Sequence, residues 1–420
     1  MKTYLLLLTG LICLSMTAFG QTPRLEIHHI GAGDGDGTLI IAIDTVNVLN
    51  IAGQKFLDTS IILIDGQRPG SSGKEVWRYV RDTVNALSPT LKKINYIVVS
   101  HLHIDHYGGI PYIISSAMRA GWRIGGVIDR QQANYNGYNS NIHDVVDSCY
   151  DSLKVVNSEG PAFEKYNDTL RKYNLSPTLA ASLNQNLLPQ DTAIGMFCVA
   201  AYGTTFATTD NPRDTCFLPV QISKGKYVYT PKSENDMSFG FIIRFQGFRY
   251  LTSGDLGGLS GGNYVNGETP MTNGILAKKE YPANYHMCVN KVDHHGSAES
   301  TTPWFASTNN FTVSVIPASL RSYGKSKHAL PTQTAIVNLG NAVNNNILYT
   351  YVPNNPSTPA SYWTKGDFSM YNDVVIKILG PPGFGQNITM TVIQRPKNKQ
   401  FVYQGNGTVQ TITCTKGHEW

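Results

Sequence analysis

The chain has 420 residues, of which 41% are hydrophobic and 15% are charged. This composition is typical of a folded globular protein with a large core, and it excludes a chain that is disordered over most of its length. The formal net charge of +5 is a mild basic bias, which by itself does not indicate a nucleic-acid-binding protein.

The first twenty residues have the order of an export signal. Lys2 precedes an apolar run from Tyr4 to Leu14, and Ala18-Phe19-Gly20 comes directly before Gln21. The apolar run is too short to span a membrane, and the sequence offers no second candidate. We therefore expect residues 1–20 to be a signal peptide. Its removal lowers the net charge from +5 to +4, and the mature protein is expected to be periplasmic or secreted, without stable membrane insertion.

Cysteines are few and have no CxxC spacing. The chain contains 6 cysteines, one of which, Cys13, lies in the predicted signal. Export allows one or two disulfides, although a chain of this length does not depend on them. Cys198 with Cys216 is the pair that we expect.

Apolar runs of strand length alternate with helical patterns along the chain. The predicted strands span Leu25–Ile30, Thr38–Ile43, Ile61–Ile64, Tyr96–Val99, Phe239–Phe245, Arg249–Leu251, Met287–Val292, Phe311–Ile316 and Val374–Leu379. The predicted helices span Lys74–Ala86, Ile110–Ala120 and Gln333–Ala342. This interleaving indicates an α/β protein with layered sheets. We expect one main domain over residues 21–380, with residues 129–232 as an insertion, and a β-rich C-terminal extension over residues 381–420.

The stretch SHLHIDHYGG, residues 100–109, is the strongest chemical signal. It places His101, His103, Asp105 and His106 directly after a predicted strand, where a tight loop can aim all four side chains at one point. Imidazole and carboxylate ligands together suit zinc, with iron or manganese as alternatives. The competing interpretation is a chance histidine cluster on a solvated loop, but a four-residue pattern of this kind seldom arises by accident.

This HxHxDH motif resembles that of the metallo-β-lactamase superfamily. The resemblance implies a four-layer αββα sandwich with two divalent metal ions, Zn²⁺ or alternatively Mn²⁺, at one edge. It implies that His101 and His103 hold the first metal and that Asp105 and His106 hold the second. The two glycines that follow would let the next helix start close to the metals.

Two further motifs occupy the places where the superfamily has its remaining ligands. Asp255, in RYLTSGDLGG, follows a predicted strand and would bridge both metals. NKVDHHGS supplies His294 and His295 at the end of another apolar run. Adjacent residues of an extended chain point in opposite directions, so only one of them is expected to coordinate. We favour His295, because a glycine follows it, and place His294 near the substrate.

Four segments of the chain point to a narrower group within this superfamily. HHIGAGDGDGTLII, ENDMSFGFIIRFQGFRYLTSGD, VDHHGS and SYGKSKHALPTQTAIVNL resemble, in that order, the metallo-β-lactamase-like domain of DNA-internalisation competence proteins, and phosphorylcholine esterases share much of this pattern. The resemblance covers about Leu25 to Leu339, apart from the predicted insertion.

One departure concerns the first metal site. β-Lactamases and glyoxalase-type thiolesterases carry a further histidine shortly before the bridging aspartate, whereas this chain has ENDMS over residues 234–238. The site would then be completed by Asn235, Asp236 or water, and Asn235 and Ser238 are expected to reach the substrate. His143 is another candidate ligand, although an ordinary surface histidine is the simpler interpretation of that residue.

Basic residues near the site favour a phosphate-bearing substrate. Arg321, Lys325, Lys327 and His328 lie in a loop that the resemblance places at the rim of the site. The alternative is a solvated basic loop. Beside metals, Arg321 and Lys325 would bind phosphate, and His328 would protonate a leaving oxygen. Asp34 is either an orienting partner of a ligand histidine or an ordinary turn residue.

These expectations combine into an exported, metal-dependent hydrolase, most simply a phosphodiesterase that acts on nucleic acid or on a phosphorylcholine-type ester. Two metals about 3.5 to 4 Å apart lower the pKa of a bridging water, and Asp105 would orient the resulting hydroxide. One alternative is a lactonase or β-lactamase-type hydrolase of carbonyl substrates. Another is a protein that binds a metal or ligand without turnover.

Overall fold

The computed structural model describes only part of the chain. The described residues are 23–33, 35–49, 55–129, 160–175, 177–178, 183, 185–188, 193–201, 203–206, 218–223, 226–230, 233–245, 247–259, 264–278, 287–318, 330–341, 347–350, 373–380, 388–395 and 408–414. Within these ranges no helix combines the length and the apolar character needed to cross a bilayer.

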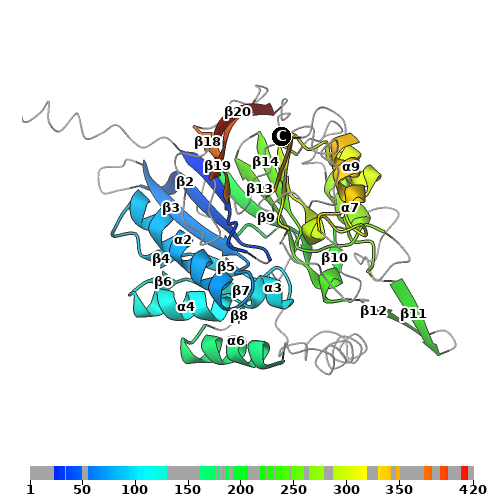
Figure 1. Ribbon diagram of the computed structural model, residues 1–420, viewed down its shortest axis with the longest axis horizontal. Helices are drawn as coiled ribbons and strands as arrows, with labels where there is room; N and C mark the ends of the chain where they lie inside the picture. The colour runs from blue at the N-terminus through cyan, green and yellow to red at the C-terminus, as the bar shows by residue number, and fades with distance from the viewer. Residues whose placement is uncertain are drawn as a thin grey trace, which may run out of the picture.

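Two large sheets form the centre of the molecule (Figure 1). The first has the order β20-β19-β18-β1-β2-β3-β5-β7-β8. Its strands are β1 (Arg24–His29), β2 (Thr38–Leu49), β3 (Lys55–Ile64), β5 (Tyr96–Val98), β7 (Val127–Ile128), β8 (Pro177–Thr178), β18 (Asp373–Leu379), β19 (Ile388–Arg395) and β20 (Thr408–Cys414). The second has the order β10-β9-β13-β14-β15-β16-β17. Its strands are β9 (Ile194–Ala201), β10 (Thr204–Thr205), β13 (Gly240–Phe245), β14 (Phe248–Thr252), β15 (Val289–Lys291), β16 (Val313–Ile316) and β17 (Ile347–Thr350).

Helices cover the outer face of each sheet, so the architecture has four layers (Figure 1). The first sheet carries α2 (Ser71–Leu87), α4 (Ile110–Arg119) and α6 (Gly160–Lys172). The second carries α7 (Glu268–Ala277), α8 (Pro303–Asn309) and α9 (Gln333–Asn341). The shorter elements are α3 (Ile104–Tyr107), two 3₁₀ turns, η2 (Glu234–Met237) and η3 (Asp293–Gly296), and the strand pairs β4 (Lys93–Ile94) with β6 (Arg123–Ile124) and β11 (Leu218–Ser223) with β12 (Lys226–Thr230).

Apolar residues on both faces of the central strands explain this layering. In β2, Ile40 and Ala42 face the core between the sheets, whereas Leu39 and Ile41 pack against the helices. Because both faces are covered, the strand reads as a continuous apolar run and not as an alternation of apolar and polar residues. The predicted α/β class with layered sheets is confirmed.

The predicted helices coincide with α2, α4 and α9 to within three residues at each end, whereas α6, α7 and α8 have no counterpart among the predicted ranges. Threonines and Gly274 break the apolar period of α7, which is held by the burial of Met271 and Ile275. Part of the range predicted as an insertion, residues 194–201, forms β9 between β10 and β13. Past residue 380, β19 and β20 extend the first sheet.

The predicted pairing of Cys198 with Cys216 is wrong. Cys198 is a buried free thiol whose Sγ donates to Ala200 O, and Cys216 lies outside the described residues. The disulfide instead joins Cys288, next to β15, to Cys414 in β20, across 126 residues. Because Cys288 directly precedes a strand of the second sheet and Cys414 ends a strand of the first, the bond links the two sheets through the core between them.

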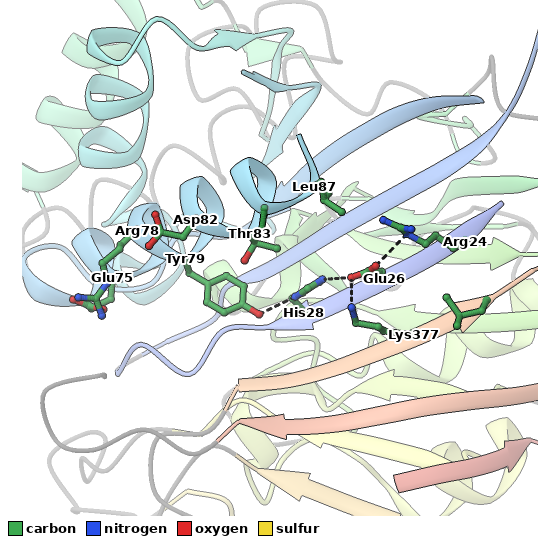
Figure 2. Close-up of a pocket in the computed structure, with 12 residues that line it drawn as sticks. Arg24, Glu26, His28, Glu75, Arg78, Tyr79, Asp82, Thr83, Leu87 and Lys377 are labelled. Carbon is green, nitrogen blue, oxygen red and sulfur yellow. Dashed lines mark hydrogen bonds and ion pairs between the residues drawn. The ribbon is translucent and has the colours of Figure 1, made fainter. Parts of the chain in front are cut away.

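A charged cavity of about 520 Å³ lies on the outer face of the first sheet, between α2, β1 and β18 (Figure 2). Glu26 is at its centre, 3.2 Å from Arg24 Nε, 3.2 Å from His28 Nε2 and 2.9 Å from Lys377 Nζ. His28 Nδ1 in turn lies 2.8 Å from the Tyr79 hydroxyl of α2. This network connects the helix to the two strands, away from the metal motif.

Candidate metal centre

The HxHxDH motif occupies the carboxyl end of β5. Two close backbone approaches explain the glycines that follow. A Cβ atom on Gly108 would lie 2.3 Å from Ile104 O, and one on Gly109 would lie 2.0 Å from Gly66 O. Only glycine therefore allows α4 to start directly after α3, packed against the loop that leads into α2.

The structure brings all six predicted ligand residues together from separate strand ends. Their side-chain donors form two adjoining groups, each with atoms within 4.8 Å of one another. The groups consist of His101, His103 and Asp255, and of Asp105, His106 and His295. All are buried except His103, which is partly exposed.

Asp255 lies between the two groups. Its Oδ2 atom is 3.3 Å from His106 Nε2, 3.4 Å from His295 Nε2 and 3.8 Å from His101 Nε2. One carboxylate oxygen facing three imidazoles is the arrangement expected of a ligand shared by two cations. His106 Nε2 and Asp255 Oδ1 are buried and have no hydrogen-bond partner among the described residues, so the donor set fits divalent metal ions.

A second set of contacts orients the imidazoles. The Nδ1 atom of His106 donates to Asp65 Oδ2 at 2.9 Å, and that of His295 donates to Pro317 O at 2.5 Å. The Nδ1 atom of His101 lies 3.1 Å from Ser100 Oγ, which donates to Asp65 at 2.7 Å. Each contact occupies Nδ1 and leaves Nε2 facing the site.

Asp65 was missed by the sequence analysis. It follows β3 in the order Ile64-Asp65-Gly66 and adopts a left-handed backbone with φ 60°. The signal that could have identified it is an aspartate at the end of an apolar run, next to the strand that carries the motif.

Asp36 was missed as well. Asp34 was predicted in its place, and it lies outside the described residues. Asp36 Oδ1 is 3.3 Å from His295 Nδ1, and Asp36 Oδ2 accepts a hydrogen bond from Lys291 Nζ. Lys291 is 3% exposed, as is the Asp36 side chain, so this is a fully buried ion pair beside the ligands.

The ENDMS segment, which has no histidine where β-lactamases have a metal ligand, forms the 3₁₀ turn η2. Asn235 is buried, and its Nδ2 atom lies 3.2 Å from His294 Nε2. Both Asp236 carboxylate oxygens accept backbone N–H groups, from Ser233 at 3.0 Å and from Val265 at 2.8 Å. Asp236 therefore holds the surrounding loops, and Asn235 is the polar side chain that faces His294.

Ser238, which was predicted to contact the substrate, contacts the Asp255 backbone in the structure. It is fully buried, and its Oγ atom accepts the Asp255 backbone N–H at 3.0 Å. The hydroxyl therefore steadies the turn that presents Asp255. The predicted contact of Ser238 with the substrate stays a prediction.

The two adjacent histidines lie in a tight turn and not in the extended chain that the sequence predicts. His294 and His295 have φ values of 46° and 52°, and Gly296 continues the left-handed backbone with φ 75°. Such strain is common at functional sites. The turn places His295 in the ligand group, whereas His294 packs edge-on against Tyr264 at 4.7 Å between ring centroids.

The buried charged groups of the site shift one another's pKa values. Burial opposes ionisation of Asp255, but His295 and His106 hold its pKa well below the usual range. Burial likewise opposes a charge on His106, but the Asp255 and Asp65 carboxylates raise its pKa well above the usual value. Burial lowers the pKa of His294 to about 4 and keeps that imidazole neutral at pH 7. The Asp255 carboxylate is thus ionised, as metal ligation requires.

Several predicted residues lie outside the part of the chain that the structure describes. These are Asp34, His143, Arg321, Lys325, Lys327 and His328. Their predicted roles stay predictions.

Comparison with known proteins gives one family match. Residues 56–119 match the family model described as the metallo-beta-lactamase superfamily. No curated protein matches the sequence.

Solved structures with a similar chain path include the metallo-beta-lactamase fold protein YhfI from Bacillus subtilis, at 8% identity and a TM-score of 0.36, covering 77% of this chain and 95% of that one. A long form RNase Z from yeast has 12% identity and a TM-score of 0.34, covering 83% of this chain and 40% of that one. A diphosphatase from the PhnP family has 10% identity and a TM-score of 0.31, with coverage of 82% and 95%. At such low TM-scores we base no inference on these three structures.

Proposed function

We propose that this protein, whose residues 56–119 match the metallo-beta-lactamase superfamily model and whose two sheets lie between layers of helices, is a metal-dependent phosphodiesterase. The observation that carries this proposal is the position of Asp255 Oδ2 within 3.8 Å of three histidine Nε2 atoms, where it can serve two ligand groups at once. His101 and His103 would hold one divalent cation, and Asp105, His106 and His295 the other.

Two bound cations would supply Lewis acidity and lower the pKa of a water at the site. The protein's own residues would do the rest. Asp105, 8% exposed, would orient that water while it serves as a ligand. His294 is outside both ligand groups and neutral, and its Nδ1 atom has no hydrogen-bond partner among the described residues. It would donate to an oxygen of the substrate.

Asn235, in the ENDMS segment that replaces the histidine ligand of β-lactamases, favours a phosphate-bearing substrate over a carbonyl substrate. Asn235 offers an amide where β-lactamases have a histidine ligand, so the first cation would be held more weakly. Phosphoryl transfer tolerates this better, because cationic and N–H donors can share the stabilisation of the anionic transition state. The predicted rim of Arg321, Lys325 and His328 would add such donors. Nucleic acid and phosphorylcholine-type esters are the substrate classes we propose.

A hydrolysis panel tests the proposal. The mature protein, loaded with zinc or manganese, is assayed with a chromogenic phosphodiester, a phosphorylcholine ester, single-stranded DNA, a lactone and a β-lactam. We expect more than one equivalent of metal and the highest kcat/KM on one of the three phosphodiester substrates. His106→Ala should lose both metal and activity, with His28→Gln as a matched buried-histidine control. A lactone or β-lactam that is turned over faster than every phosphodiester would replace this proposal with the carbonyl hydrolase, and metal binding without any turnover would favour a binding protein.

We also propose that the protein is exported. Besides the N-terminal pattern, the Cys288–Cys414 disulfide supports this, because such bonds persist mainly in oxidising compartments. N-terminal sequencing of protein from its native host should begin near Gln21. Recovery of intact Met1 would contradict export through this signal.

A further inference from the structure

Lys291 is a buried cation beside a centre that is proposed to bind cations. It lies at the end of β15 and is 3% exposed. Its Nζ atom donates to the Asp36 carboxylate and to Gly254 O at 2.7 Å, and it lies 3.9 Å from Asp255 Oδ1. A positive charge so close to Asp255 opposes metal binding electrostatically, and a buried ion pair is seldom a better source of stability than apolar packing. Its presence therefore calls for another explanation.

The contacts of Lys291 join three separate segments of the metal centre. The Asp36 segment packs on the HxHxDH motif, where Asp36 N donates to Asp105 O at 3.1 Å, and Asp36 Oδ1 lies 3.3 Å from His295 Nδ1. Gly254, with φ 58°, forms the turn that presents Asp255. Lys291 itself belongs to the strand that leads into His294 and His295.

We propose that Lys291 is a positioning residue of the metal centre. Its ammonium group ties the Asp36 segment and the Gly254 turn to β15, so that Asp255 and His295 hold their ligand atoms in place. This inference rests on the metal site of the proposed function and gives a role to a residue that is not itself one of the proposed ligands. Positioning and charge make opposite predictions for Lys291→Met: loss of positioning weakens metal binding, whereas removal of a positive charge alone strengthens it.

The test measures metal affinity and ligand geometry in Lys291→Met. Zinc affinity, determined by chelator competition, is expected to fall about 10-fold to 100-fold, as for other partners that orient ligands. The visible absorption spectrum of the cobalt-loaded protein should also change, because it reports the coordination geometry directly. Asn290→Ala is the matched control. Asn290 is buried on the same strand, but its Oδ1 atom accepts from Ser314 Oγ and not from the metal centre, so both measurements should match the wild type.

Zinc binding by Lys291→Met that is as tight as in the wild type or tighter, with an unchanged cobalt spectrum, would overturn the inference. If this variant does not fold, the double variant Asp36→Asn/Lys291→Met removes both buried charges. We expect it to show the same loss of affinity, whereas wild-type affinity in the double variant would mean that Lys291 only neutralises Asp36. Failure of both variants to fold in the presence of zinc would assign Lys291 to general stability and also overturn the inference.

The outcome is separable from that of the proposed function. Wild-type protein that binds zinc but hydrolyses none of the panel substrates would overturn the phosphodiesterase and leave the role of Lys291 intact. Wild-type protein that binds no divalent metal would overturn both.

Discussion

Each imidazole of the centre has two ring nitrogens, and the structure gives them different tasks. Asp65, Pro317 and Ser100 engage Nδ1 of His106, His295 and His101, respectively, and so direct three Nε2 atoms to one place. A ligand that is already oriented loses little rotational freedom when a metal binds. The residues behind the ligands are therefore expected to contribute to metal affinity as well.

Asp65→Asn should test this directly. The variant loses the charged acceptor of His106 Nδ1–H, so we expect metal affinity to fall by roughly 10-fold to 100-fold. Chelator competition measures the loss. Asp58→Asn, on the strand that precedes Asp65, is the control, because Asp58 pairs with Lys93 at a partly exposed position. Equal affinities in the two variants would show that Asp65 does not orient a ligand.

The adjacent histidines should separate metal binding from catalysis. His295→Ala removes a side chain of the ligand group and should lower the metal content. His294→Ala removes a neutral donor outside that group, so it should keep the wild-type metal content and lower kcat, most strongly for substrates with poor leaving groups. Elemental analysis and steady-state kinetics check the two variants side by side. Loss of metal from His294→Ala would make His294 a ligand in its own right.

At the scale of elements, the attachment of α2 to the first sheet contains a buried charge network. Glu26 of β1 contacts Arg24, His28 and Lys377, and His28 contacts Tyr79 of the helix (Figure 2). Burial alone would raise the pKa of Glu26, but the basic partners, His28 above all, lower it from 4.5 to about 2. The folded protein thus favours the ionised carboxylate more than the unfolded chain does.

The sign of the pH effect follows from this lowered pKa. The stabilisation is fully present above pH 4.5 and is lost as the pH falls towards 2. Glu26→Gln should therefore reduce the free energy of unfolding by about 2–3 kcal/mol at pH 7. The difference from wild type should shrink below pH 4.5. Urea titrations at several pH values measure it. A difference that stays constant from pH 7 to pH 3 would exclude this linkage.

At the scale of the whole molecule, the metal centre lies where strands of both sheets end. The first sheet supplies the motif after β5 and Asp65 after β3, and the second supplies Asp255 after β14 and His295 after β15. The centre therefore depends on how the two sheets are held against each other. Besides the apolar core, the Cys288–Cys414 disulfide makes that connection.

Removal of this disulfide should destabilise the protein as a whole. The double variant Cys288→Ser/Cys414→Ser removes a bond that joins residues 126 positions apart and so restricts the unfolded chain. We therefore expect the free energy of unfolding to fall by about 2–5 kcal/mol. Denaturant unfolding of the metal-loaded protein measures the change. Cys198→Ala, which removes a buried free thiol, should cost less. A reducing agent should destabilise the wild type and leave the double variant unaffected, and equal sensitivity of the two would contradict the role of the bond.

The sequence by itself determined the layered α/β class, most of the central strands and the side chains that form the two ligand groups. These were predictable because each motif is a local signal: an apolar run that ends in ligand-type residues. The resemblance to a known family joined the three separate motifs into one site. The orienting residues were not predictable in this way. Asp36, Asp65 and Lys291 are single charged residues at strand ends or in turns, and their types and spacing do not predict which ligand residue each of them contacts.

Only the tertiary structure decided which of these residues meet. Lys291 reaches Asp36 across 255 positions, and Cys288 pairs with Cys414 across 126 positions. Such contacts depend on strand order within each sheet and on the packing of one sheet against the other. The left-handed turn at His294 and His295 is also a tertiary outcome, because local sterics disfavour it and only contacts with the surrounding strand ends can stabilise it. The ligand types therefore followed from the sequence, whereas their orientation and their buried partners followed from the fold.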